Sequence, residues 1–131
     1  MSKLPHIKLH FKSDNTCIIL NANNIRAIIN GDGSGSFIYS SEDEKFWTNE
    51  SPSKIISLIS ECDENLRADF IKCHGHSTNS IGYFNARSIE LICTKKNVTT
   101  IVINKKLHLC VNESPETLYN LMNQPIKTEK K

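Results

Sequence analysis

The chain has 131 residues, of which 38% are hydrophobic and 23% are charged, and its formal net charge is +2. This composition is typical of a globular protein and excludes the disordered and fibrous classes. The net charge is too small to indicate a nucleic-acid partner by itself.

The length predicts a single domain over residues 1–124, with a polar tail over 125–131 and no fused receiver domain. No apolar run reaches the roughly 18 to 20 residues of a membrane span, and residues 1–6 do not form the apolar core of a secretory signal. Five cysteines without a CxxC pair are a poor disulfide framework. We therefore expect a cytoplasmic protein with free thiols packed as small hydrophobic groups.

Alternation of β-branched and aromatic residues between turn residues predicts the strands. In the first half, strands are expected over residues 6–12, 16–20, 25–29, 36–40 and 45–48. In the second half, they are expected over residues 70–73, 88–93, 98–103 and 107–111, with turns at 42–44 and 104–106. The glycine-rich residues 31–36 lack the Gly-Lys-Ser/Thr ending of a phosphate loop and precede a strand, so they predict a hairpin connection.

Two Ser-Pro pairs, Ser51-Pro52 and Ser114-Pro115, predict helix starts. A serine side chain accepts a hydrogen bond from a free N–H of the first turn, and proline at the first helical position loses no bond. Apolar residues then recur at helical spacing, so we expect both helices to pack against the core.

The sequence contains an internal repeat. Residues 20–25 (LNANNI) return as 84–89 (FNARSI), and residues 49–52 (NESP) return as 112–115. The prediction is a mostly β, β-rich α+β fold with two short helices, made of two related β-hairpin/helix halves.

Charge is distributed unevenly along the chain. Residues 42–69 hold eight acidic and three basic side chains, net −5, whereas residues 71–111 hold six basic side chains and one acidic side chain, net +5. One part of the surface is therefore expected to face a polyanion. No nucleophile-base signature or paired-carboxylate motif is present, so an enzyme is not predicted.

Part of the sequence resembles the LytTR DNA-binding family. A helix over residues 52–62 is followed by a strand, Phe70-Ile71-Lys72-Cys73-His74, that matches the family pattern Phe-x-Arg-x-His. Asn85 and Ile89 supply the Asn and Ile, four residues apart, that follow in the family. The resemblance covers residues 18–122.

The resemblance implies an elongated antiparallel β fold whose loops enter successive major grooves of double-stranded DNA. It implies a sequence-specific transcriptional regulator that needs no cofactor or small-molecule substrate. A homodimer on DNA is compatible with the resemblance. Lysines would neutralise phosphates, and His or Asn side chains would bond to phosphates or base edges. The residues implied for DNA contact are Lys72, His74, His76, Lys95, Lys96, Lys105, Lys106 and Asn112.

The sequence departs from the family pattern in three places. Gly75 replaces the arginine after the histidine, and residues 75–79 read as an insertion. Asn112-Glu113 stands where members often carry Ser-Arg, and a carboxylate at Glu113 would repel phosphate.

Two other interpretations stay open at this stage. Each half also looks like short flagellar-operon proteins made of one such unit, which predicts a protein-interaction module. A Cys/His metal site formed by Cys73, His74, His76, His108 and Cys110 is the second alternative, although the spacing fits no common zinc pattern.

Overall fold

The structure is a computed structural model that describes residues 4–31, 35–40, 44–76, 78, 80–103 and 107–123. The predicted tail over 125–131 and the predicted turns at 42–44 and 104–106 lie wholly or largely outside the described residues. Among the described residues, no helix is long and apolar enough to cross a membrane.

The two halves of the chain contain the same elements in the same order. The first half consists of β1 (His6–His10), β2 (Cys17–Asn21), the 3-10 helix η1 (Ala22–Asn24), β3 (Ile25–Asn30), β4 (Ser36–Ser40), β5 (Lys45–Thr48) and α1 (Pro52–Cys62). The second half consists of β6 (Phe70–His74), β7 (Ile81–Asn85), the 3-10 helix η2 (Ala86–Ser88), β8 (Ile89–Lys95), β9 (Val98–Ile103), β10 (Leu107–Val111) and α3 (Pro115–Met122). The predicted repeat is confirmed.

All strand pairs are antiparallel, as expected. The strands form a two-stranded sheet β1-β2, a five-stranded sheet β5-β4-β3-β7-β6 and a three-stranded sheet β10-β9-β8. Single bridges join these sheets: Phe11 pairs with Thr48, and Gly75 pairs with Val111. The pairing is therefore continuous from β2 at one side of the molecule to β8 at the other.

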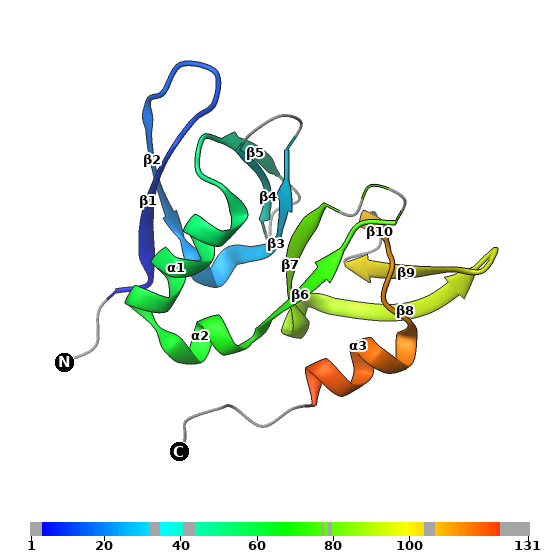
Figure 1. Cartoon of the computed structure of the whole chain (residues 1–131). Coiled ribbons are helices and arrows are strands. Elements are labelled where there is room, and N and C mark those ends of the chain that lie inside the picture. The colour runs from blue at the N-terminus through cyan, green and yellow to red at the C-terminus, as the bar shows by residue number, and fades with distance from the viewer. Residues whose placement is uncertain are drawn as a thin grey trace.

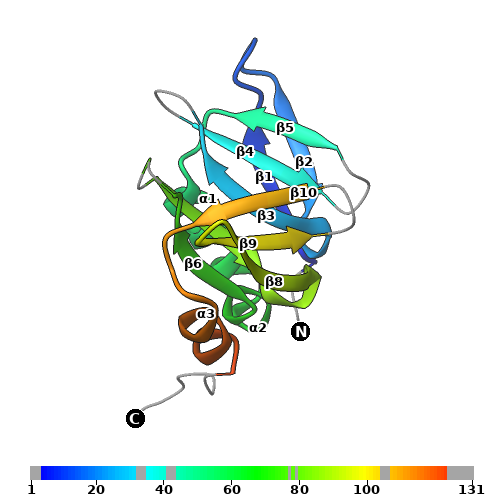
Figure 2. The same ribbon diagram turned by 90° about the vertical axis from the view of Figure 1, so that its right-hand side faces the viewer.

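Each face of the five-stranded sheet covers a separate core. On one face, Ile28 and Ile38 pack with Ile55 and Ile59 of α1. On the other face, the core contains residues of the three-stranded sheet and of α3. Figure 2 shows this layering, with β9 and β10 lying across β3 and β4. The fully buried aliphatic side chains of both halves thus hold the three sheets together.

Four elements were not predicted: the 3-10 helices η1 and η2, the strand β7 and the helix α2. In β7 (Ile81–Asn85) all residues after Ile81 are buried, because the strand is covered on both faces, so the alternation that marks a half-buried strand is missing. The five-residue helix α2 (Glu64–Ala68) follows α1 directly, and the Asp63 side chain accepts hydrogen bonds from the main-chain N–H groups of Asn65 and Leu66.

The predicted helix starts are confirmed. Ser51 caps α1 by accepting a hydrogen bond from the N–H of Lys54, and Ser114 caps α3 in the same way from Thr117. All five cysteines are free, but only Cys73 is buried. Cys17 and Cys110 are exposed, because their strands have a solvent face, so the expectation of buried thiols is wrong for these two.

Candidate nucleic-acid interface

The strand register brings four hairpin turns and both strand-to-helix connections to one edge of the connected sheets. These are the β1–β2, β3–β4, β6–β7 and β8–β9 turns and the β5–α1 and β10–α3 connections, and we call this edge the rim. The paired strand residues that place these turns on the rim are His10–Cys17, Phe11–Thr48, Ser36–Thr48, Asn30–Ser36, Ile29–Gly82, His74–Ile81, Gly75–Val111, Thr99–Val111 and Thr94–Thr99. Figure 1 shows the β1–β2 turn at the top and α2 near the bottom, at the end away from the rim.

Three of the predicted contact residues meet on the rim. The main-chain N–H of Asn112 donates to the carbonyl of His74 over 2.8 Å, and that of His76 donates to the carbonyl of Cys110 over 3.0 Å. These bonds place the ends of β6 and β10 side by side. His76 and Asn112 are exposed, and His74 is half-buried.

Lys95 and Lys96 occupy the β8–β9 turn on the same rim. Lys95 pairs with Val98, and the two residues between them, Lys96 and Asn97, have φ angles of 53° and 67°. Two consecutive positive φ angles define a type I′ hairpin, whose twist matches that of the flanking strands. Both lysine side chains are exposed, so the turn presents two cations.

Of the remaining predicted lysines, the structure describes Lys72 alone, and it is not part of this cluster. Lys72 is exposed on β6 but lies two residues back from His74, away from the rim. Lys105 and Lys106 lie outside the described residues. The residues that flank their segment, Ile103 and Leu107, pair with each other at the far end of the three-stranded sheet from Lys95.

Glu113 forms a partly buried link with His74 that the sequence analysis missed. Its carboxylate accepts a hydrogen bond from the main-chain N–H of His74, with N–O distances of 3.0 and 3.1 Å, and its Oε2 lies 2.7 Å from the ring Nδ1. The Glu113 side chain is only 16% exposed. The expected repulsion of phosphate by this residue is therefore reduced, because the carboxylate points into the protein and is bonded there.

The pKa of Glu113 reflects two opposing effects. Burial raises the pKa of this carboxyl, and the hydrogen bonds from the main chain and ring of His74 lower it by more, so the net shift is below the ordinary value of 4.5. The carboxylate therefore stays charged at neutral pH and holds the His74 ring in place on the rim.

Acidic side chains concentrate at the opposite end of the molecule. α1 runs from the rim at Pro52 toward α2, and β6 starts there at Phe70, which pairs with Asn85. The acidic residues of this end are Glu61, Asp63, Glu64 and Asp69. The uneven charge of the sequence thus becomes a spatial separation, which favours approach of a polyanion to the rim.

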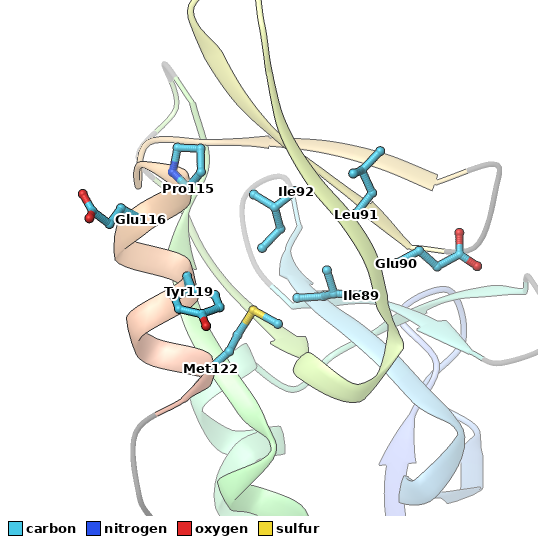
Figure 3. Close-up of a pocket in the computed structure, with 8 residues that line it drawn as sticks. All are labelled: Ile89, Glu90, Leu91, Ile92, Pro115, Glu116, Tyr119 and Met122. Atoms are coloured by element: carbon cyan, nitrogen blue, oxygen red, sulfur yellow. The ribbon is translucent and has the colours of Figure 1, made fainter.

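A groove between β8 and α3 lies on a different part of the surface. It has a volume of about 530 Å³ and is lined by Ile89, Glu90, Leu91, Ile92, Pro115, Glu116, Tyr119 and Met122. In Figure 3 its floor is apolar, and the carboxylates of Glu90 and Glu116 lie at its two sides. Such a lining does not suit a nucleic acid.

The alternative metal site is not formed by the residues that the structure covers. Within those ranges, no group of three His, Cys, Asp or Glu side chains converges. Cys73 is buried, and burial raises the pKa of its thiol to about 12, so the thiolate that a metal needs is disfavoured. The Nδ1 atom of His74 is occupied by Glu113.

The fold and the rim together define an antiparallel β domain whose turns form one continuous edge. This fold is shared with the LytTr DNA-binding domain of a Bacillus cereus protein described as a methyl-accepting/DNA response regulator. The TM-score is 0.61 at 14% sequence identity, over 92% of this chain and 98% of that chain. No family model matches the sequence, and no curated protein matches it. The similarity confirms the LytTR-type fold expected from the sequence.

Proposed function

We propose that this protein is a sequence-specific, double-stranded DNA-binding transcriptional regulator that contacts DNA through the turns of the rim. The observation that carries the proposal is the joint placement of Lys95, Lys96, His76 and Asn112 on one edge of a LytTr-type fold. The role is non-enzymatic and intracellular.

The chemistry of the rim suits a duplex. Lysine ammonium groups on a projecting hairpin neutralise phosphates, and a two-stranded ribbon fits the major groove, which is about 12 Å wide. Asn112 and His76 are exposed beside that hairpin and supply donors and acceptors for phosphates or base edges. The acidic end faces away, and the exposed acidic residues on the rim side include Asp14 in the β1–β2 turn and Glu116 at the start of α3.

Selection of bound sequences from a random DNA pool tests the proposal. We expect one enriched motif. Two spaced copies of the motif in a bound duplex would indicate that two protomers bind together. Sedimentation of the complex measures the number of bound protomers. Absence of enrichment at low salt contradicts the proposal.

Paired variants test the contact residues. The double variant Lys95→Gln, Lys96→Gln is expected to reduce the slope of log affinity against log salt concentration by about 1.8, because each phosphate contact contributes about 0.9. The control is Arg87→Gln, which removes a cation at the opposite end, where the 79% exposed Arg87 pairs with Asp69. Equal slopes for the two variants contradict the assignment of these lysines.

A protein-interaction module is the second candidate, and the β8–α3 groove favours it. Leu91 and Tyr119 beside this groove are 53% and 66% exposed, which is uncommon for such large apolar side chains. The variant Leu91→Ser, Tyr119→Ser distinguishes the two functions, because it leaves DNA affinity unchanged if the rim binds DNA.

A further inference from the structure

The internal repeat reproduces the backbone of the rim in the first half. The N–H of Asn49 donates to the carbonyl of His10 over 2.9 Å, as that of Asn112 does to His74 over 2.8 Å. The N–H of Lys12 donates to the carbonyl of Trp47 over 2.8 Å, as that of His76 does to Cys110 over 3.0 Å. His10, Lys12 and Asn49 thus occupy the positions that His74, His76 and Asn112 occupy in the second half.

The partly buried histidine-glutamate link is repeated as well. Glu50 accepts a hydrogen bond from the main-chain N–H of His10 over 3.1 Å, and its Oε2 lies 2.7 Å from the ring Nδ1. The side chains of Glu50 and Glu113 are 14% and 16% exposed. A glutamate therefore fixes the ring of a histidine at each of the two equivalent places, and both carboxylates are turned away from the rim surface.

Both sets lie on the same edge. Asn49 follows Thr48 at the end of β5, and Asn112 follows Val111 at the end of β10. The strands between these two ends follow the order β5-β4-β3-β7-β6-β10. Five strand spacings of about 4.8 Å give a separation of about 24 Å along the sheet. This path is an upper bound on the direct distance, because the three-stranded sheet packs over the five-stranded sheet, so the two sets span at most about seven base pairs, less than one helical turn.

The chemistry of the first set also matches that of a DNA contact. Lys12 is half-buried and supplies a cation, and Asn49 is exposed with its side-chain N–H donating to Asn15. The exposed acid nearest to them in sequence is Asp14, whose carboxylate is bonded to the hydroxyl and main-chain N–H of Thr16. The β1–β2 turn and the β5–α1 connection are therefore equipped like their second-half equivalents.

We propose that His10, Lys12 and Asn49 form a second DNA-contact set, so that one protomer holds the duplex at two points related by its internal repeat. This inference rests on the proposed function. It predicts that the first half contributes affinity and sequence preference to one side of the site contacted by the second half, within about seven base pairs.

The test uses the full chain and a duplex recovered from the random pool. Lys12→Gln is expected to reduce the salt slope by about 0.9 and to weaken binding roughly 3- to 10-fold, whereas Lys12→Arg keeps the slope. Asn49→Ala is expected to remove hydroxyl-radical protection from one flank of the footprint. Arg87→Gln again serves as the charge-matched control, and thermal unfolding of each variant verifies that it is folded.

The outcomes separate this inference from the proposed function. If Asn112→Ala and Lys96→Gln weaken binding while Lys12→Gln and Asn49→Ala leave slope and footprint unchanged, the second contact set is refuted and DNA binding stands. If all four variants bind like the unaltered chain, both proposals fail. A shortened footprint together with a reduced slope supports the second set.

Discussion

Replacing Glu113 with glutamine tests whether the rim depends on the partly buried link between β6 and the β10–α3 connection. The carboxylate accepts one main-chain hydrogen bond and one ring hydrogen bond, both from His74. A bond to a charged group contributes about 1.5 to 3 kcal/mol when buried. The ring of His74 is 40% exposed, so its bond counts as a surface pair of about 0.5 kcal/mol.

Glutamine retains an acceptor oxygen but loses the charge. We therefore expect Glu113→Gln to lower the free energy of unfolding by about 1.5 to 2 kcal/mol at pH 7. For a domain of this size, about 3 to 5 °C of Tm corresponds to each kcal/mol, so the Tm should fall by about 5 to 8 °C. Differential scanning calorimetry measures this directly.

The effect has a defined pH dependence. Since the folded-state pKa of Glu113 lies below the ordinary value of 4.5, the carboxylate stabilises the fold fully above that value, and the stabilisation is lost as the pH falls through the folded-state pKa. Glutamine does not titrate. The Tm difference between the two proteins should therefore be constant from pH 7 to about 5 and shrink at lower pH.

The repeat supplies a matched second measurement. Glu50 has the same partners in the first half, and burial and hydrogen bonding to His10 shift its pKa in the same net direction. Glu50→Gln should give a Tm loss and a pH profile of similar size. A Tm difference below about 2 °C, or one that is unchanged at pH 3.5, refutes the reasoning for either site.

Three further changes test local features of the fold. Lys96→Asn should raise the free energy of unfolding by a few tenths of a kcal/mol, because asparagine tolerates the positive φ of Lys96 better, and equilibrium unfolding measures this. The same change should reduce the slope of log DNA affinity against log salt concentration by about 0.9, which titration at several salt concentrations measures. Ser51→Ala and Ser114→Ala should each cost about 1 kcal/mol in urea unfolding, since each serine caps a helix; no loss would mean that solvent replaces the cap. Gly35→Ala should cost more than about 1 kcal/mol, because Gly35 has φ +81° and an added Cβ would lie 2.1 Å from the carbonyl oxygen of Thr48; a neutral result in the same assay would show that the turn relaxes.

The sequence by itself determined the local elements and their repetition. β4, whose buried and half-buried side chains alternate, and β9, a run of β-branched residues, began and ended where the sequence predicted, and the Ser-Pro pairs fixed the starts of α1 and α3. These features depend on neighbouring residues, whose side-chain period and capping hydrogen bonds are encoded within a few positions. The LytTR resemblance supplied the expected fold.

The tertiary structure alone decided which residues meet. β7 escaped prediction because both of its faces are covered, which removes the alternation. The link between Glu113 and His74 spans 39 positions, and the rim results from register between strands far apart in the chain. Such register depends on the packing of three sheets around two cores, a long-range property that no local pattern encodes.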